Sequence, residues 1–417
     1  MKRLLKVSAL SGMLTLLKML MGFIIAKVIA VYTGPAGMAM LGQIQNIINS
    51  FNGIVNSPVS NGVVRFTAEN NKSGFYKCSP WWRASLEWLI ILCVITIPLG
   101  FLFSDYLSTW LFETKEFGWL IKLTVIFLPL TAFGTLISSV INGLENFRRY
   151  IILIMVSVLI SSCLMIVMII YAGLKGALIA AVFQSSMIGA VMLLTNIKQP
   201  WFSLTYWWGN TNSKARKDIA GYILMAVTSA ITAPLSLILV RNIIIYHSGW
   251  EQAGQWQAVW KISEVYLSII TISLSTYFLP KLASKADVGG IIQEINKTAL
   301  IVIPLAIIMA VVVYTGRDIA IYILFTEQFR AARELFAIQL LGDIVKIISW
   351  LYAYPMLSRG ATKWYVSTEI LFSASFVILS WFLVGEYGNA HGANVAYLIN
   401  YTFYFLFIIV NFKKIIK

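Results

Sequence analysis

Apolar segments long enough to cross a membrane follow one another along this chain of 417 residues. A bilayer core of about 30 Å requires about 20 apolar residues per helix. Because hydrocarbon offers no partners to backbone N–H and C=O groups, such segments fold as helices that satisfy their own hydrogen bonds. The twelve predicted spans are 7–32, 38–66, 84–104, 118–141, 150–172, 176–197, 218–245, 252–279, 297–316, 331–357, 364–385 and 391–412.

The composition agrees with an all-α polytopic membrane protein of about 12 transmembrane helices. Hydrophobic residues make up 59% of the chain and charged residues only 12%, about half the usual share for soluble domains. The opening Met1-Lys2-Arg3 precedes an apolar run longer than that of a signal peptide, so we expect an uncleaved first helix. Loops are short and there is no phosphate-binding loop, which argues against ATP hydrolysis.

Charge predicts the topology. About two thirds of the 32 lysines and arginines fall in loops on the side of the two termini, so the positive-inside rule places both termini in the cytoplasm. The net charge of +15 is explained by basic loops that face anionic lipid headgroups. We therefore expect no nucleic-acid partner. Three cysteines and two histidines have no metal or redox spacing, so we expect no metal, cofactor or disulfide.

The second half of the chain repeats short patterns of the first. Gly143–Phe147 (GLENF) is similar to Gly360–Trp364 (GATKW), and Tyr171–Ala177 (YAGLKGA) is similar to Tyr387–Ala393 (YGNAHGA). Asp105…Leu111-Phe112…Phe117 is likewise similar to Asp318…Leu324-Phe325…Phe329. Because the three matches keep a nearly constant offset of roughly half the chain, they indicate a duplication of six spans.

This duplication predicts two pseudo-symmetric six-helix bundles around a central cavity, related by an axis along the membrane normal. The predicted parts are a first bundle at 1–200, an interfacial linker at 201–217 and a second bundle at 218–417.

A polar stripe on the eighth span is the strongest functional signal. In 255–275 (QWQAVWKISEVYLSIITISLS) the polar residues step by three or four positions, which places them on one helical face. A charge at mid-bilayer costs roughly 3 kcal/mol, so this face meets a wet cavity or a protein partner. The stripe consists of Gln257, Lys261, Glu264, Ser268, Thr271 and Ser275.

Other spans carry similar stripes. Lys18 belongs to one on span one. Span two carries Gln45, Asn49, Asn52 and Asn56, and span ten carries Gln339, Asp343, Lys346 and Trp350. Polar side chains in membrane helices can also bond to their own backbone or hold helices together, and a structural role of this kind is the alternative for every stripe.

The charges are spaced to pair within their helices. Lys261 with Glu264, and Asp343 with Lys346, are opposite charges three residues apart. With Lys18 added, the cavity has three cations against two anions. A cationic cavity lined by amides and hydroxyls suits an anionic substrate rich in hydroxyl groups, because amides both donate and accept hydrogen bonds.

Three fragments resemble a known family. They are Gly34-Pro35-Ala36-Gly37, then Trp256-Gln257 with Tyr266-Leu267 and Leu279-Pro280, then Phe336-Ala337 with Gln339-Leu340 and Gly342-Asp343. In this order they resemble the Wzx-type flippases of lipid-linked oligosaccharides, in the O-antigen and enterobacterial common antigen branch. That family belongs to the multidrug/oligosaccharidyl-lipid/polysaccharide exporter superfamily.

The resemblance implies a bacterial inner-membrane protein that moves a sugar repeat unit on undecaprenyl pyrophosphate, with O antigen as the expected product. The polymerase and the chain-length regulator of the same pathway are the expected partners, beside membrane lipid. On this hypothesis Lys18, Lys261 and Lys346 hold the pyrophosphate. The sugar-binding candidates are Gln45, Asn49, Asn52, Asn56, Gln257, Ser268 and Gln339.

Two further roles remain open at the level of sequence. Glu264 and Asp343 are candidates for proton coupling, although their neighbouring lysines oppose protonation. Arg65, Arg148 and Arg149 are candidates for the cytoplasmic opening, and a role in topology explains them equally well. The alternative functions are a drug or cation antiporter and a membrane polysaccharide polymerase. The polymerase would need a catalytic outer loop, and every outer loop here is short.

Overall fold

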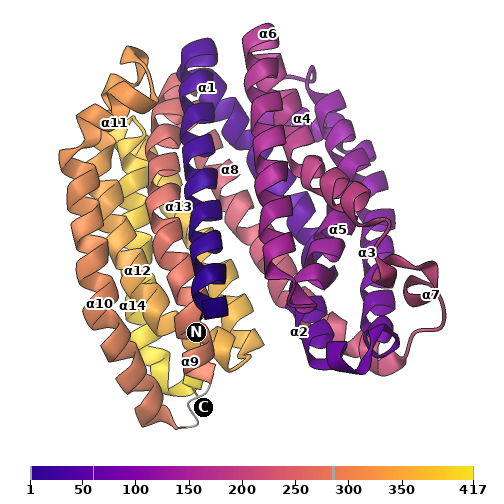
Figure 1. The fold of residues 1–417 in the computed structure, drawn as a ribbon. Coiled ribbons are helices and arrows are strands. Elements are labelled where there is room, and N and C mark those ends of the chain that lie inside the picture. Colours follow the sequence, from indigo (N-terminus) through magenta and orange to yellow (C-terminus); the bar gives the residue numbers. More distant parts are fainter. Residues whose placement is uncertain (1, 60, 284–286, 417) are drawn as a thin grey trace. The chain divides into compact units, whose positions relative to one another are not determined.

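A computed structural model of the chain describes residues 2–59, 61–283 and 287–416 (Figure 1). This described part is almost entirely helical and contains no β-strand, so the all-α prediction is confirmed. The long helices are α1 (Lys2–Asn56), α3 (Phe75–Leu102), α5 (Gly118–Gly143), α6 (Phe147–Asn196), α8 (Ser213–Ser273), α10 (Val288–Thr315), α12 (Phe336–Ser358), α13 (Thr362–Tyr387) and α14 (His391–Ile416). The shorter helices are α2 (Asn61–Asn70), α4 (Ser104–Phe112), α7 (Leu204–Trp207), α9 (Leu279–Ala283) and α11 (Arg317–Leu324).

Nine helices of the described residues are long and apolar enough to cross a membrane. Three of them exceed one crossing, since α1 would extend about 80 Å if straight and the hydrocarbon core is about 30 Å thick. Each is interrupted by a glycine with positive φ, namely Gly34 in α1, Gly173 in α6 and Gly249 in α8. A left-handed backbone of this kind favours glycine. Counting each interrupted helix as two crossings gives the twelve that the sequence predicts.

The predicted second span differs from the structure at its C-terminal end. Instead of one helix over 38–66, α1 ends at Asn56, a 3₁₀ turn covers Ser57–Val59, and α2 begins at Asn61. Pro58 explains the break, because proline has no N–H for the helical ladder. The predicted eighth span also differs near its end, where a π-helical turn covers Leu274–Phe278.

The order of elements repeats along the chain. A helix interrupted by glycine opens each half, since α1 breaks at Gly34 and α8 breaks at Gly249. A short helix then separates two long ones, with α4 between α3 and α5, and α11 between α10 and α12. This order agrees with the duplication read from the sequence.

The chain divides into two compact units. The first comprises 1–32 and 43–234, and the second comprises 33–42 and 235–417. The predicted linker 201–217 therefore lies within the first unit, and the chain passes to the second inside α8, after Pro234. That the two bundles act as separate bodies around a cavity stays a prediction.

Close helix packing holds the first unit together. Gly134 of α5 faces Gly189 of α6 so closely that a Cβ on Gly134 would lie 2.2 Å from the Cα of Gly189. Such small residues let membrane helices approach each other. At one end of the unit, the fully buried Trp82 of α3 stacks on Trp207 of α7, with ring centroids 5.3 Å apart.

Candidate functional site

A buried carboxylate lies at the centre of the candidate site in the second unit. Asp343 of α12 is only 1% exposed. The Tyr266 hydroxyl of α8 donates to its Oδ2 at 2.6 Å, and the Tyr397 hydroxyl of α14 donates to its Oδ1 at 2.9 Å. Gln339, one turn earlier on α12, donates from Nε2 to Oδ1 at 3.2 Å. Three donors from three helices thus replace the water that this buried group has lost.

Gly342 makes this arrangement possible. A Cβ on Gly342 would lie 2.4 Å from Cδ1 of Tyr397. The absence of a side chain on Gly342 therefore lets the Tyr397 ring lie against α12, with its hydroxyl beside Asp343. The sequence neighbours Gly342 and Asp343 act together, one giving space and the other accepting the hydrogen bond.

Lys346 lies in a cage of aromatic rings. Lys346 and Asp343, whose spacing predicts an intrahelical pair, are not among the close ion pairs of the described residues. The Asp343 carboxylate is occupied by its three donors, and the ammonium faces ring surfaces instead. A cation near such surfaces gains about 2 kcal/mol when both are desolvated. Lys346 Nζ lies 5.5, 4.9, 5.5 and 5.2 Å from the ring centroids of Trp260, Trp350, Tyr397 and Tyr401.

The other predicted pair is formed. Lys261 Nζ lies 3.1 Å from Glu264 Oε2. The Trp260 indole N–H donates to Glu264 Oε1, also at 3.1 Å. The side chains of Lys261 and Glu264 are 33% and 48% exposed, so both charges remain open to a ligand or solvent.

Two cavities of the second unit adjoin these residues. The smaller one, of about 190 Å³, brings together five predicted site residues: Glu264, Ser268, Gln339, Asp343 and Lys346. The larger one, of about 480 Å³, shares Thr271 and Trp350 with the smaller. In the smaller cavity, the buried Gln339 has an amide oxygen without a hydrogen-bond partner, so it is available to a donor on a ligand.

The remaining predicted residues lie elsewhere. Gln257 is buried in the second unit, where it accepts a hydrogen bond from Arg241 and lines neither of these cavities. The first unit holds Lys18 and the amides Gln45, Asn49, Asn52 and Asn56, all on α1. Lys18 and Asn49 are exposed and the other three amides are half-buried.

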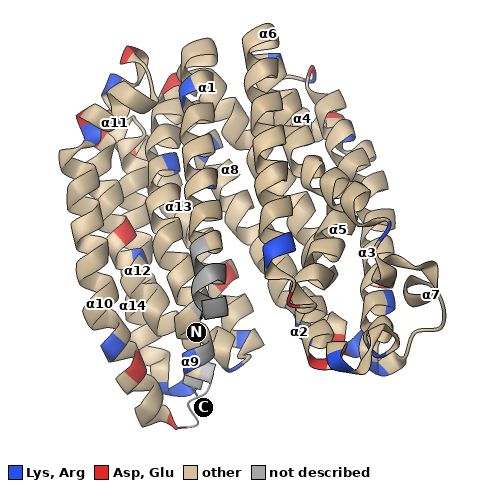
Figure 2. Cartoon of the chain, viewed as in Figure 1, with Lys and Arg blue, Asp and Glu red and all other residues tan. Residues whose placement is uncertain are grey.

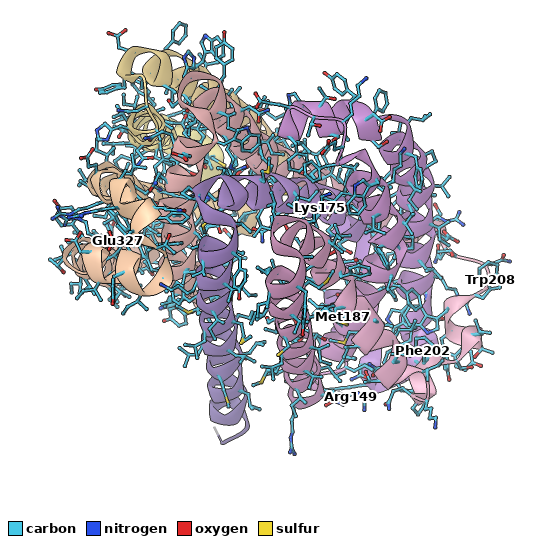
Figure 3. All side chains as sticks on the ribbon, turned by 90° about the horizontal axis from the view of Figure 1, so that it is seen from above. Arg149, Lys175, Met187, Phe202, Trp208 and Glu327 are labelled. Atoms are coloured by element: carbon cyan, nitrogen blue, oxygen red, sulfur yellow. The ribbon has the colours of Figure 1, made fainter. Side chains whose placement is uncertain are left out.

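The three predicted arginines of the first unit differ in their surroundings. Arg65 pairs with Glu69 at 2.8 Å on α2. Arg149, labelled in Figure 3, donates to Asn196 Oδ1 at 3.0 Å and to the Thr195 carbonyl at 2.7 Å. Arg148 is exposed. Arg65 and Arg149 thus stabilise local structure, which does not prevent them from also contacting a substrate.

Sequence reasoning missed two features. Arg241, which the sequence analysis did not single out, is 1% exposed, and its guanidinium lies 5.6 Å from the centroid of the Trp256 ring. Its position within an apolar run was the available signal. The aromatic cage was also missed, although two of its members, Tyr397 and Tyr401, lie four residues apart on one face of α14.

The fold and the site together define a class. The chain is a multi-pass membrane protein that buries charged side chains inside a helical bundle, and intramembrane charges mark substrate and ion pathways in transporters. The chain belongs to the family of polysaccharide biosynthesis proteins, which matches residues 4–285.

Known proteins agree with this class. Lipid III flippases of Escherichia coli (strain K12) and Shigella flexneri are each 26% identical over 402 residues, covering 96% of this chain and of the relative. Among solved structures, the inward closed lipid II flippase MurJ matches with a TM-score of 0.70 and 15% identity, covering 99% of this chain and 90% of MurJ. An outward-facing multidrug transporter of the MATE family matches with a TM-score of 0.67 and 14% identity, covering 98% of this chain and 96% of the transporter. These structural matches show the fold.

Proposed function

We propose that this chain flips an oligosaccharide repeat unit linked to undecaprenyl pyrophosphate from the cytoplasmic to the periplasmic leaflet of the bacterial inner membrane. The similarity to lipid III flippases over 96% of the chain carries this proposal. The two bundles would alternate between inward-open and outward-open states, while the polyprenyl tail stays in lipid. O antigen is the product that we expect.

The protein must replace the water around the head group. Sugar hydroxyls and phosphate oxygens cross hydrocarbon too slowly unaided, because each loses its hydrogen bonds. Lys18, Lys261 and Lys346 would hold the pyrophosphate, since an ammonium attracts phosphate as a point charge. The position of Lys346 at a cavity and the partial exposure of Lys261 support this assignment.

The polar side chains would serve the sugars and the route to them. The proposed sugar-binding side chains are Gln45, Asn49, Asn52, Asn56, Gln257, Ser268 and Gln339. Of these, Ser268 and Gln339 adjoin the cavity that holds Lys346. Arg65, Arg148 and Arg149 would line the cytoplasmic opening, with both termini on that side. The polymerase and chain-length regulator of the pathway would act on the released unit.

Energy would come from a proton gradient through Glu264 and Asp343. Both carboxylates line the cavity that also holds Lys346, so a change in their protonation would alter its charge. Collapse of the proton gradient with an ionophore should stop flipping in vesicles. Flipping that continues at an unchanged rate would remove this part of the proposal.

Deletion of the gene tests the function. We expect undecaprenyl-linked single repeat units to accumulate on the cytoplasmic face and the surface polysaccharide to disappear. The mass of the trapped lipid would identify the sugars and decide between O antigen and the common antigen. Normal surface polymer with altered export of drugs or cations would instead assign the chain to the antiporters.

A lysine variant tests the site. Lys261→Ala should lower flipping about tenfold or more, as expected when a charged hydrogen-bond partner is lost. The measurement is restoration of surface polymer in the deletion strain at matched protein levels. Lys363→Ala, which removes an exposed lysine of α13, is the control and should restore the polymer. Full restoration by Lys261→Ala would contradict the assignment.

A further inference from the structure

The larger cavity of the second unit forms a groove that has no part in the phosphate-binding, sugar-binding or proton-coupling roles proposed above. Its volume of about 480 Å³ lies within the range of about 300–1,000 Å³ that small-molecule sites occupy. Residues of α8, the following π-helical turn, α12, α13 and α14 line it, among them Trp350, Tyr354, Tyr365, Glu369 and Tyr404. All belong to one compact unit.

The chemistry of this lining fits a sugar ring. Trp350, Tyr354, Tyr365 and Tyr404 are aromatic, and Glu369 adds a carboxylate. A pyranose presents C–H groups on its face and hydroxyls around its edge. Aromatic rings offer broad apolar surface to the face, and a carboxylate accepts strong hydrogen bonds from hydroxyls.

Trp350 connects this groove to the proposed phosphate site. Its ring lies 4.9 Å from the Lys346 ammonium and also lines the groove. A ligand with its phosphate near Lys346 would therefore place the next group along its chain in the groove. In a lipid-linked oligosaccharide the pyrophosphate is bonded to the first sugar on one side and to the polyprenyl chain on the other, so one of these two groups would enter the groove.

We infer that this groove binds the sugar ring attached directly to the pyrophosphate. The aromatic side chains stack on the ring, and Glu369 accepts hydrogen bonds from its hydroxyls. This inference rests on the proposed function for the identity of the ligand. A polyprenyl tail is the alternative occupant, but a carboxyl group that faces hydrocarbon costs free energy, so Glu369 favours a polar occupant.

Binding of simple sugars tests the groove independently of transport. The full chain is placed in nanodiscs of phosphatidylethanolamine and phosphatidylglycerol, which avoids sugar-based detergents. Saturation-transfer NMR is recorded with three methyl glycosides, those of glucose, galactose and N-acetylglucosamine. We expect transfer to the ring protons of at least one glycoside. No transfer to any of the three would overturn the inference.

Matched variants locate the binding. Tyr354→Leu and Glu369→Gln should each weaken glycoside binding about tenfold, by loss of ring contact and of a charged acceptor. Tyr354→Phe keeps the ring and should bind within about threefold of the parent. The controls are Tyr352→Leu on α12 and Glu386→Gln on α13, which alter residues outside the groove. Equal losses of glycoside affinity in the groove variants and the controls would show that the sugar does not bind in this groove.

A lipid probe and a cell assay separate the remaining outcomes. Undecaprenyl phosphate should bind the groove variants as tightly as it binds the parent chain. Weaker binding of this lipid by the groove variants alone would show that the groove holds the polyprenyl tail. In the deletion strain, Glu369→Gln should restore the surface polymer poorly and Glu386→Gln should restore it fully. Full restoration by Glu369→Gln overturns the groove alone, whereas failure of the parent chain to restore the polymer overturns the proposed function.

Discussion

Gly342 shows how a single residue controls the geometry of the candidate site. Its missing side chain lets the Tyr397 ring lie against α12, where the tyrosine hydroxyl reaches Asp343 at 2.9 Å. The same ring forms one wall of the cage around Lys346. Tyr397 is 1% exposed, so neighbouring side chains enclose its ring.

Gly342→Ala should therefore destabilise the protein by about 1–3 kcal/mol, the usual cost of overpacking a filled interior. The measurement is the thermal unfolding midpoint of the purified chain in nanodiscs, which should fall. Gly385→Ala is the control in the same unit, because its Cβ would lie 3.6 Å from the His247 ring, an ordinary contact. Equal midpoints for the two variants would show that Tyr397 is not held as described.

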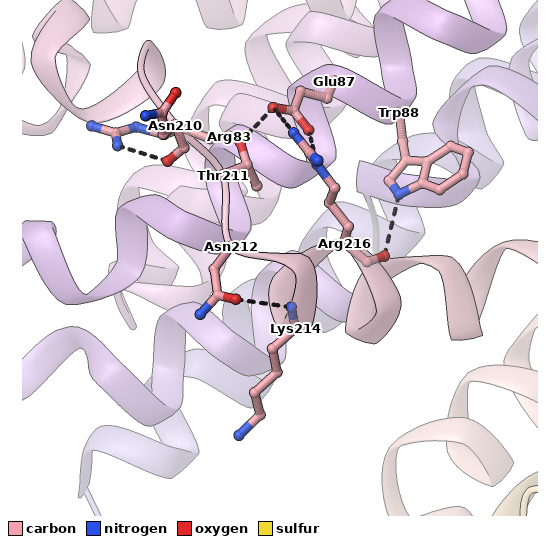
Figure 4. Close-up of polar contacts among 8 residues, drawn as sticks. All are labelled: Arg83, Glu87, Trp88, Asn210, Thr211, Asn212, Lys214 and Arg216. Carbon is pink, nitrogen blue, oxygen red and sulfur yellow. Dashed lines mark hydrogen bonds and ion pairs between the residues drawn. The ribbon is translucent and has the colours of Figure 1, made fainter.

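At the scale of elements, α3 fixes the segment that precedes α8 (Figure 4). Arg83 donates to the carbonyls of Thr205, Tyr206 and Asn210 at 2.5, 3.3 and 3.4 Å. One turn later, Glu87 accepts from Arg216 at 2.7 Å. The predicted interfacial linker is thus a folded part of the first unit.

One residue of this segment nevertheless faces outward. Trp208 is 74% exposed and lies at the outer edge of its unit in Figure 3. An exposed tryptophan at the end of a helical bundle suits the membrane–water interface.

Arg83→Ala should release the segment from α3. Three backbone carbonyls would lose a charged donor. Each hydrogen bond of this kind contributes at most roughly 1.5–3 kcal/mol to stability, and less where water competes for the donor. We expect amide hydrogen exchange in residues 203–212 to accelerate at least about tenfold. Lys77→Ala on the same helix, an exposed position, should leave the exchange unchanged. An unchanged rate in Arg83→Ala would show that α7 and its flanks hold without this clamp.

At the scale of the whole molecule, the distribution of charge sets the orientation in the membrane. Figure 2 shows Lys and Arg of the first unit around the ends of α2 and α3, and those of the second around α9 and the nearby end of α10, with some Asp and Glu among them. A mixed group of both signs lies around α11. Basic loops remain on the cytoplasmic side during insertion, so the first two groups are expected in the cytoplasm.

Cysteine labelling tests this orientation. In a background with Cys78, Cys93 and Cys163 changed to Ala, a membrane-impermeant maleimide should label Lys175→Cys in intact spheroplasts. Lys413→Cys should react only after permeabilisation. The reverse pattern would place both termini outside and would contradict the predicted topology.

Local pattern was enough to predict much of this protein. The twelve crossings follow from apolar length, because a helix in lipid satisfies its own backbone. The Lys261–Glu264 pair follows from a spacing of three on one helix. Periodicity also places Glu264 and Ser268 on one face of α8, and Gln339, Asp343 and Lys346 on one face of α12. These five residues line one cavity, and their proposed roles stay predictions.

Contacts between helices decided the rest. Asp343 and Lys346 have the same spacing as Lys261 and Glu264, yet Asp343 takes donors from α8 and α14 and Lys346 takes an aromatic cage. The burial of Arg241 and the packing of residues 33–42 with the second unit likewise depend on tertiary contacts. Periodicity determines which residues share a helical face, because that depends on one segment alone. Which side chains meet across faces depends on how distant segments pack, and only the folded structure determines that.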